Sequence, residues 1–349
     1  MNDTNKYKLS FTTGALTHVG CVRTNNEDNF LVSTDLSTGK WILPQDNQHL
    51  FPLEQKGAML IVADGMGGLD AGEVASKIAV DTVKEFFMPE RITDETVQDE
   101  SHIRAYLCEA IVEADRRIKT QSREVYNGKS IGTTIVVAWL LDGYANIAWC
   151  GDSRAYRFDA VSGLQQVTKD HSYVQELIDS GRLLPEYAFD HPDNNIITRS
   201  LGNPQKKAEP DFVRIVLHEG ETLLFCTDGL NAMLRDEEIE SLMQKTASRT
   251  DTCLKALLNQ TLEAGGYDNV TILLCQIAPT EHSENAPAQQ ETLSTFAEKK
   301  KLRKLNPHVW LFGLFCMLLI GGLLWFFLSK EPVNTWKQKI IQWYEQIGK

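Results

Sequence analysis

The hydrophobic residues of the first 278 positions fall into short apolar runs that are separated by longer amphipathic stretches. Five of these runs have the length and the Val, Ile and Leu content that are typical of buried strands. They are residues 59–63, 131–140, 145–150, 222–226 and 270–277. The pattern therefore predicts a body that is built on buried sheets.

Three longer segments carry apolar residues three or four positions apart, which is the spacing of an amphipathic helix. They cover residues 74–87, 103–118 and 254–262. These helices lie between groups of strands and do not follow every strand. Because runs of neighbouring strands favour antiparallel sheets, the order predicts an α+β layered fold in which helices flank the sheets.

A different pattern begins after residue 278. Residues 279–307 are rich in polar and small residues and end in a basic segment, which is typical of a linker. Residues 309–328 then carry no charge over 20 positions, enough for a helix to cross a bilayer core about 30 Å thick. We expect a transmembrane helix over residues 308–329 and a short tail over 330–349. The alternative is a buried core helix, which seldom lacks a polar face over this length.

The charges around this span predict its orientation. Five Lys/Arg residues lie at positions 299–304, just before it, and Trp310 and Trp325 lie near its ends, where indole rings settle at the interface. The positive-inside rule therefore places the N-terminal domain, residues 1–278, on the cytoplasmic side of a single-pass anchor. Residues 1–30 are polar and lack the apolar run of a secretory signal.

The net charge of −12 is unevenly distributed. Residues 299–349 carry nine Lys/Arg and two Asp/Glu, a balance of +7, which leaves −19 for the rest of the chain. An acidic body argues against nucleic acid as a partner, because phosphate contacts need a basic face. The seven cysteines include no CxxC pair, so we expect buried free thiols in a reducing compartment rather than a zinc site or a disulfide framework.

Aspartates stand where the apolar runs begin or end. Asp64, Asp152 and Asp228 each follow a run, whereas Asp28 and Asp268 each precede one. If the strands share sheets, several carboxylates converge at one end of the fold, where they repel one another unless a cation is bound. Mg²⁺ and Mn²⁺ prefer such oxygen ligands. A lone Asp-Gly pair is usually only a turn, so this interpretation depends on the repetition of the pattern.

The chain contains nine short motifs, and five of them include these acids. They are Gly20-Cys21-Val22-Arg23, Asn26-Glu27-Asp28-Asn29-Phe30, Val62-Ala63-Asp64-Gly65-Met66-Gly67-Gly68, Gly132-Thr133-Thr134, Gly151-Asp152-Ser153-Arg154-Ala155-Tyr156, Asp170-His171-Ser172, Thr198-Arg199-Ser200-Leu201-Gly202, Cys226-Thr227-Asp228-Gly229-Leu230 and Asp268-Asn269-Val270-Thr271. In this order, over residues 14–277, the chain resembles the bacterial branch of the metal-dependent type 2C serine/threonine phosphatases.

The resemblance implies an α-β-β-α sandwich of two antiparallel sheets with a centre for two or three Mn²⁺ or Mg²⁺ ions at one end. It implies the following roles: Asp64 bridges two ions, Gly65 offers its carbonyl to one of them, Asp228 and Asp268 complete the other, Glu27 and Asp28 hold metal-bound waters, Asp152 contributes to a possible third metal position, and Arg23 binds phosphate. A guanidinium can grip phosphate oxygens in a bidentate manner, which a lysine cannot.

The resemblance further implies hydrolysis of phosphoserine and phosphothreonine on proteins by a metal-bridged hydroxide. A cognate bacterial Ser/Thr kinase would be opposed, and the anchor would lie in the bacterial inner membrane. Met66 stands where many eukaryotic members carry a histidine that is a candidate general acid, and a thioether cannot donate a proton. His171 is expected to order the segment after Asp170 rather than to act as that acid. Residues 172–195 correspond to the flap beside the site.

Two other functions fit the same sequence. A catalytically silent, membrane-anchored scaffold would be expected to lose Asp64, Asp228 or Asp268, yet all three are present. A phosphatase of small phosphate esters would use the same residues. Within residues 33–57, Trp41, Leu50 and Phe51 are expected to pack as a hairpin or a cover, without an assigned role.

Overall fold

The computed structural model describes residues 9–42, 49–67, 71–246 and 249–278, all within the first of two units of the chain, Met1–Glu281. The predicted linker, transmembrane span and tail, residues 279–349, lie outside the described residues. Within the described part of the chain, no helix combines the length and the apolar character that crossing a bilayer requires.

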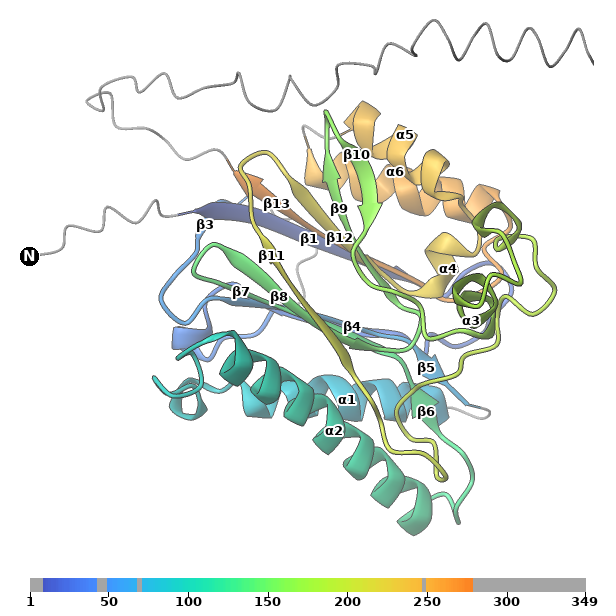
Figure 1. Ribbon diagram of the computed structural model, residues 1–349, viewed down its shortest axis with the longest axis horizontal. Helices are drawn as coiled ribbons and strands as arrows, with labels where there is room; N and C mark the ends of the chain where they lie inside the picture. The colour runs from blue at the N-terminus through green and yellow to red at the C-terminus, as the bar shows by residue number, and fades with distance from the viewer. Residues whose placement is uncertain (1–8, 43–48, 68–70, 247–248, 279–349) are drawn as a thin grey trace, which may run out of the picture. The chain divides into compact units, whose positions relative to one another are not determined.

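Two antiparallel sheets form the centre of the fold (Figure 1). The first has the order β10-β9-β12-β13-β1-β3 and the second the order β11-β8-β7-β4-β2. The strands of the first are β1 (Ser10–His18), β3 (Phe51–Pro52), β9 (Arg154–Asp159), β10 (Gly163–Gln166), β12 (Thr222–Cys226) and β13 (Val270–Ala278). Those of the second are β2 (Asn29–Ser33), β4 (Ala58–Ala63), β7 (Ile135–Leu141), β8 (Tyr144–Cys150) and β11 (Asp211–Val216). A short pair, β5 (Gly65–Met66) and β6 (Gly132–Thr133), extends from one end.

Helices cover the outer face of each sheet, as Figure 1 shows. One helix pair, α1 (Ala71–Phe86) and α2 (Glu100–Glu124), packs on the second sheet, and the other pair, α5 (Asp236–Thr246) and α6 (Thr250–Glu263), packs on the first. The remaining elements are α3 (Tyr173–Asp179), α4 (Asp228–Asn231) and the 3₁₀ turns η1 (Leu36–Thr38), η2 (Pro89–Arg91) and η3 (Pro185–Tyr187). The predicted layered α+β sandwich is confirmed.

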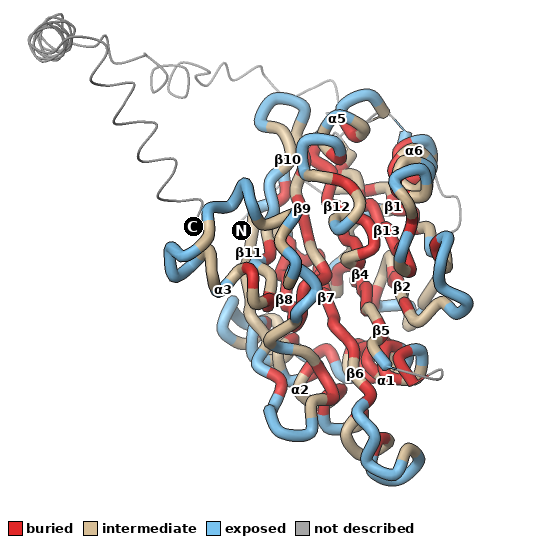
Figure 2. Tube along the Cα trace, turned by 90° about the vertical axis from the view of Figure 1, so that its right-hand side faces the viewer, coloured by how far each residue is buried: buried red, intermediate tan, exposed pale blue. Residues whose placement is uncertain are grey.

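The apolar strands are buried on both faces, which explains why their sequences do not alternate with polar residues. In β4, Met59 and Ile61 belong to the core beneath α1 and α2, whereas Leu60 and Val62 belong to the core between the two sheets. A third core lies between the first sheet and the helices α4–α6. Figure 2 shows this buried interior running along β4, β7, β12 and β13, with exposed positions gathered in the loops.

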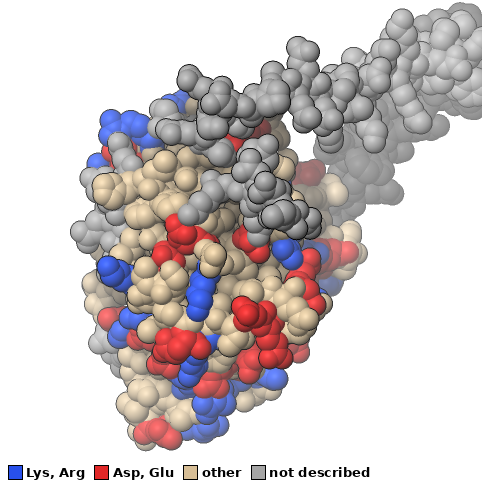
Figure 3. All heavy atoms as spheres, turned by 90° about the vertical axis from the view of Figure 1, so that its left-hand side faces the viewer, with Lys and Arg blue, Asp and Glu red and all other residues tan. Residues whose placement is uncertain are grey.

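All five strands and all three helices expected from periodicity are present, but two finer expectations are wrong. Cys21 is exposed, because it lies in the loop after β1 and not in an apolar run. Leu50 is 55% exposed, whereas Phe51 enters β3 and its ring packs 6.0 Å from that of Phe11. On the face shown in Figure 3, acidic and basic side chains of the described residues are interspersed.

Candidate active site and metal centre

Four buried or partly buried aspartates come together at the end of the sandwich. Asp64 follows β4 and Asp152 follows β8 in the second sheet, Asp228 follows β12 in the first, and Asp28 precedes β2. Burial raises the pKa of Asp64 well above its usual value, and the charges of Asp228, Asp28 and Asp152 raise it further. Carboxylates repel one another in this way only when they are close in space.

Asp64 is fixed by the threonines of the Gly132-Thr133-Thr134 motif. The backbone carbonyl of Asp64 accepts hydrogen bonds from the Thr133 hydroxyl at 2.7 Å and from the Thr134 N–H at 2.9 Å. The Asp64 N–H in turn donates to the Thr134 Oγ1 at 3.2 Å. With the backbone held on both sides, the carboxylate has a defined direction, which an ion-binding group requires.

Asp28 is held by two buried hydroxyls that come from distant strands. The Thr227 Oγ1 donates to the Asp28 Oδ2 at 2.9 Å and the Thr271 Oγ1 donates to the same oxygen at 2.7 Å. The Asp28 Oδ1 has no hydrogen-bond partner among the described residues. Burial is the main cause that raises the pKa of Asp28, to about 7, against the opposing effect of the two hydroxyls.

Asp152 presents a second orphaned oxygen. Its side chain is 5% exposed, and its Oδ1 has no hydrogen-bond partner in the described part of the protein. Burial, followed by the charge of Asp228, raises the pKa of Asp152 well above its usual value. The next residue, Ser153, shares a 2.6 Å hydrogen bond with Thr134, so the loop that carries Asp152 is tied to the residue that positions Asp64.

The charge of Asp228 raises the pKa of each of the other three aspartates. Burial, followed by the charge of Asp268, raises the pKa of Asp228, whereas a hydrogen bond with the Asp64 carboxyl lowers it. Neighbouring buried carboxyls cannot all carry charge without a cation, and a divalent ion would relieve this repulsion.

Arg23 and Asp268 form an ion pair at the rim of the site. The Arg23 Nη2 donates to the Asp268 Oδ2 at 2.7 Å, and the side chains are 56% and 40% exposed. The loop that carries them is held by Asn269, whose Oδ1 accepts from the Glu27 N–H at 2.8 Å and whose Nδ2 donates to the carbonyls of Val19 and Asn25. Both rim groups therefore lie where a ligand could reach them.

Gly65 stands at a point with no room for a side chain. A Cβ at this position would lie 2.3 Å from the Gly72 carbonyl oxygen and 2.4 Å from that of Glu27. A Cβ at Gly72 would lie 2.5 Å from the Glu27 Oε2, so the start of α1 packs against the Glu27 carboxylate. Gly68, the last residue of the motif around Asp64, lies outside the described residues.

The donor set fits a hard divalent cation. It consists of carboxylates with raised pKa values, and two of them carry a buried oxygen without a hydrogen-bond partner in the described structure. Within residues 9–42, 49–67, 71–246 and 249–278, no three His, Cys, Asp or Glu side chains form a closed ligand set around a single point. Mg²⁺ and similar ions commonly keep several waters and take few protein ligands, so an open arrangement is compatible with them.

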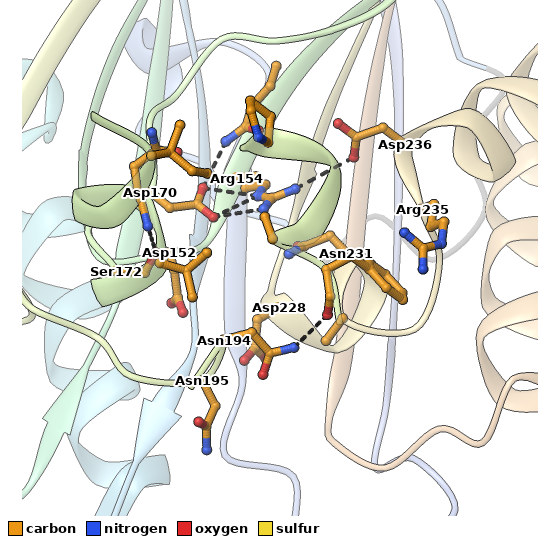
Figure 4. Close-up of a pocket in the computed structure, with 18 of the residues that line it drawn as sticks. Asp152, Arg154, Asp170, Ser172, Asn194, Asn195, Asp228, Asn231, Arg235 and Asp236 are labelled. Carbon is orange, nitrogen blue, oxygen red and sulfur yellow. Dashed lines mark hydrogen bonds and ion pairs between the residues drawn. The ribbon is translucent and has the colours of Figure 1, made fainter. Parts of the chain in front are cut away.

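A groove of about 580 Å³ leads from Asp152 and Asp228 to the segment 172–195 (Figure 4). Arg154 lies along it and makes a bidentate contact with Asp170, its Nε and Nη2 donating at 2.9 and 2.7 Å. Across the groove, the Arg235 Nη2 donates to the Asp190 Oδ2 at 2.6 Å, and its guanidinium lies 4.2 Å from the centroid of the Phe189 ring. The segment therefore has a second attachment away from its base.

The hydroxyls that hold the acids have no role that the sequence alone predicts. Thr133, Thr134, Ser153, Thr227 and Thr271 are all buried. Each stands beside a predicted strand end or inside a motif, and a hydroxyl at an otherwise apolar buried position is itself a signal, because it must find a partner there. What the sequence does not display is which acid each one serves.

Comparisons with known proteins agree with this geometry. A family model described as Protein phosphatase 2C matches residues 41–284. Protein phosphatase PhpP of Streptococcus pneumoniae is 35% identical over 266 residues, which is 74% of this chain and 94% of the relative. The crystal structure of the serine/threonine phosphatase PstP/Ppp of Mycobacterium tuberculosis has a TM-score of 0.63 at 28% identity, covering 78% of this chain and all of that one. A PstP catalytic domain in complex with two manganese ions has a TM-score of 0.61 at 27% identity, with the same coverage.

Proposed function

Because the chain belongs to the protein phosphatase 2C family of metal-dependent hydrolases that act on phosphoproteins, we propose that it removes phosphate from phosphoserine and phosphothreonine through a metal centre at Asp64 and Asp228. The observation that carries the proposal is the meeting of Asp28, Asp64, Asp152 and Asp228 beside the exposed Arg23. Buried acids that repel one another cost stability unless the site binds cations.

The proposed ion ligands are residues of the acid cluster and of the rim described above. Asp64 would be shared by two Mn²⁺ or Mg²⁺ ions, with the Gly65 carbonyl on one and Asp228 and Asp268 on the other. Asp28 and Glu27 would hold waters of the ions, and Asp152 would serve a third position. Bound ions of this class lower the pKa of water, which supplies a nucleophile near neutral pH.

Arg23 would orient the phosphate group of the substrate and bind its negatively charged oxygens. Arg23 is 56% exposed and pairs with a carboxylate that is a proposed ion ligand. If Asp268 held an ion, the Arg23 guanidinium would be free to bind phosphate oxygens in a bidentate manner. His171 is 5% exposed and both ring nitrogens are engaged in hydrogen bonds. It is therefore not placed to protonate the leaving serine or threonine oxygen, and Met66 cannot do so.

The direct test is hydrolysis of a phosphothreonine peptide by the purified full-length chain with and without Mn²⁺, beside Asp64→Asn and Asp228→Asn. The expected result is phosphate release that needs the metal and is lost in both variants. A folded wild-type protein that releases no phosphate with any divalent ion would overturn the proposal and favour a silent scaffold. Turnover of p-nitrophenyl phosphate without turnover of phosphopeptides would favour a phosphatase of small esters.

We also propose, from the sequence of residues 299–349, that the enzyme is anchored to a membrane with residues 1–278 on the cytoplasmic side and, from its resemblance to bacterial members of the family, that this is the inner membrane and that it acts on substrates of a cytoplasmic Ser/Thr kinase. The supporting features are the uncharged stretch 309–328 and the five cations before it. Cell fractionation with alkaline carbonate extraction tests the anchor. Recovery of the full chain in the carbonate-soluble fraction, at the same level as a variant with Leu318→Arg and Leu319→Arg, would contradict it.

A further inference from the structure

His171 holds the peptide unit beside Asp152 from two sides. The His171 backbone N–H donates to the Gly151 carbonyl at 3.0 Å, and the His171 Nδ1 accepts from the Gly151 N–H at 3.1 Å. Gly151 directly precedes Asp152 and has φ of 126°, a conformation that side chains rarely adopt. A loop in such a conformation needs contacts that hold it, and these two hydrogen bonds come from one residue.

The hydrogen bonds also define the tautomer of the ring. Because the Nδ1 accepts a hydrogen bond from the Gly151 N–H, the neutral ring carries its hydrogen on Nε2, which lies 3.1 Å from the Asp211 Oδ2 at the start of β11. The ring stacks on Trp149 with centroids 6.0 Å apart and planes at 19°. Burial lowers the pKa of His171, which favours this neutral form.

The same residue forms the base of the segment 172–195, which we call the flap. The His171 carbonyl accepts from the Thr198 N–H at 2.8 Å, and the Tyr173 N–H donates to the Ile196 carbonyl at 2.8 Å. A bridge between Ser172 and Ile197 completes this stem. The chain therefore enters and leaves the flap at one paired stem, and His171 is the first residue of that stem.

We propose that His171 is a positioning residue that fixes the Asp152 loop and the base of the flap as one unit, so that the ion-binding end of the groove and its substrate-binding wall keep a constant separation. The proposal rests on the proposed function. It assigns His171 no contact with substrate or ion. Its effect passes through Gly151 to the orphaned carboxylate oxygen of Asp152, and through Thr198 to the flap.

Two amide substitutions separate the roles of the two ring nitrogens. In His171→Asn the side-chain oxygen can take the place of Nδ1 and accept from the Gly151 N–H. In His171→Gln the amide reaches the position of Nε2, so the contact with Asp211 is retained and that with Gly151 is lost. If positioning acts through Gly151, the Asn variant should retain most of the function and the Gln variant should not.

The assay uses the full-length chain and measures three quantities: the Mn²⁺ concentration for half-maximal hydrolysis of p-nitrophenyl phosphate, KM for a phosphothreonine peptide, and the thermal midpoint. We expect His171→Gln to raise the first two by about tenfold, as loss of an outer contact to a ligand commonly does, and His171→Asn to stay within about threefold of wild type. Equal effects of the two variants, or a changed thermal midpoint with unchanged Mn²⁺ dependence and KM, would overturn the proposal.

A double-mutant cycle with Asp152→Asn tests whether His171 acts through Asp152. If His171 acts through Asp152, His171→Gln should change the Mn²⁺ dependence by less than about twofold in the Asp152→Asn background, because neighbouring positions are not additive. The same fold-change in both backgrounds would contradict the route. If His171→Gln does not fold, ¹⁵N shifts of the wild-type ring decide instead, since a protonated Nδ1 excludes the proposed hydrogen bond.

These outcomes are distinct from failure of the proposed function. An inactive wild-type chain that binds Mn²⁺ would contradict the phosphatase proposal. The cycle can then be read from Mn²⁺ binding alone, with the same expected non-additivity. An active wild type with indistinguishable His171 variants would leave the phosphatase proposal intact and reject the positioning role.

Discussion

Arg23 and Asp268, which are predicted to bind phosphate and metal respectively, bind each other at 2.7 Å. The pair keeps both groups at the rim of the site without a permanently unpaired charge. Loading with an ion and phosphate would exchange each partner for a ligand of opposite charge. Substrate binding and metal binding are therefore expected to be coupled through this contact, since each ligand frees the residue that the other needs.

Replacement of Arg23 tests this coupling. Arg23→Lys keeps the charge but loses the bidentate geometry, so we expect kcat/KM for a phosphopeptide to fall about tenfold, and further in Arg23→Ala. Arg116→Lys, at an exposed arginine of α2 that lies outside both the rim pair and the groove, is the matched control. Steady-state kinetics at saturating Mn²⁺ provide the measurement. An unchanged kcat/KM in Arg23→Lys would show that a point charge suffices.

Metal binding should stabilise the fold as well as support the activity. The repulsion among Asp28, Asp64, Asp152 and Asp228 is relieved when a cation binds the native state, and stability then rises with the logarithm of the metal concentration. We expect the thermal midpoint to increase on adding Mn²⁺ and to decrease on adding EDTA. In Asp64→Asn the metal-free protein should melt higher than metal-free wild type and gain less from Mn²⁺. Equal Mn²⁺ gains in both proteins would contradict this view of the site.

Thr227 should be needed for its hydroxyl. It is fully buried, donates to Asp28 and accepts from the Thr271 N–H at 2.9 Å. Thr227→Val keeps the shape but leaves the Thr271 N–H without this acceptor and the Asp28 Oδ2 with one hydroxyl donor instead of two. This should cost about 1–3 kcal/mol of unfolding free energy and raise the Mn²⁺ requirement about tenfold. Thr227→Ser is the matched control. Urea unfolding and Mn²⁺ titrations check the two effects, and a Val variant that behaves as the Ser variant would refute the role.

The contact between Arg235 and Asp190 should matter more for substrates than for stability. Both side chains are exposed, and such pairs contribute about 0–1 kcal/mol. Arg235→Ala releases the flap from the body, so we expect KM to rise for phosphopeptides that lie in the groove but not for p-nitrophenyl phosphate. Asp190→Ala should give the same pattern, without a further change in the double variant. Equal changes for both substrates would place the effect at the metal centre instead.

An ion pair on α2 predicts a small pH dependence of stability far from the site. Hydrogen bonds from Arg116 and then Arg117 lower the pKa of Glu113 from 4.5 to about 2. Since the folded pKa lies below the unfolded one, this stabilisation is present above about pH 4.5 and is lost as the pH falls toward 2. Partial exposure limits it to about 1 kcal/mol. Glu113→Gln should lower the unfolding free energy at pH 7 but not near pH 2, as measured by urea unfolding, and an equal deficit at both values would exclude the ion pair as its cause.

The central strands could be predicted because they are apolar on both faces, as β4 and β12 are. Strands with mixed sequences could not. β11 is only half-buried along its length, and β1 interleaves threonines with apolar residues because Thr13 is satisfied by the Leu274 carbonyl at 2.9 Å. Neither has the periodicity that marks an element on its own.

For the site, the sequence shows the acids but not their supports. Asp28 depends on Thr227 and Thr271, which are 199 and 243 positions away. Separations of this size leave no local pattern, and only the pairing of strands defines them. The role of His171 has the same origin, since its partners Gly151, Thr198 and Asp211 lie on three different segments.

The pairing of β1 with β13 runs over the full length of both strands, from Ser10 opposite Ala278 to His18 opposite Val270. The first strand of the body thus finds its central partner only when the last has been synthesised. On a translating ribosome the residues before 268 would have to wait, because Arg23 cannot meet Asp268, and Asp28 cannot meet Thr271, until those residues have been synthesised. Activity would therefore be expected only after the whole domain has emerged, because a chain that stops short of β13 leaves Asp28 without the Thr271 hydroxyl and β1 without its central partner.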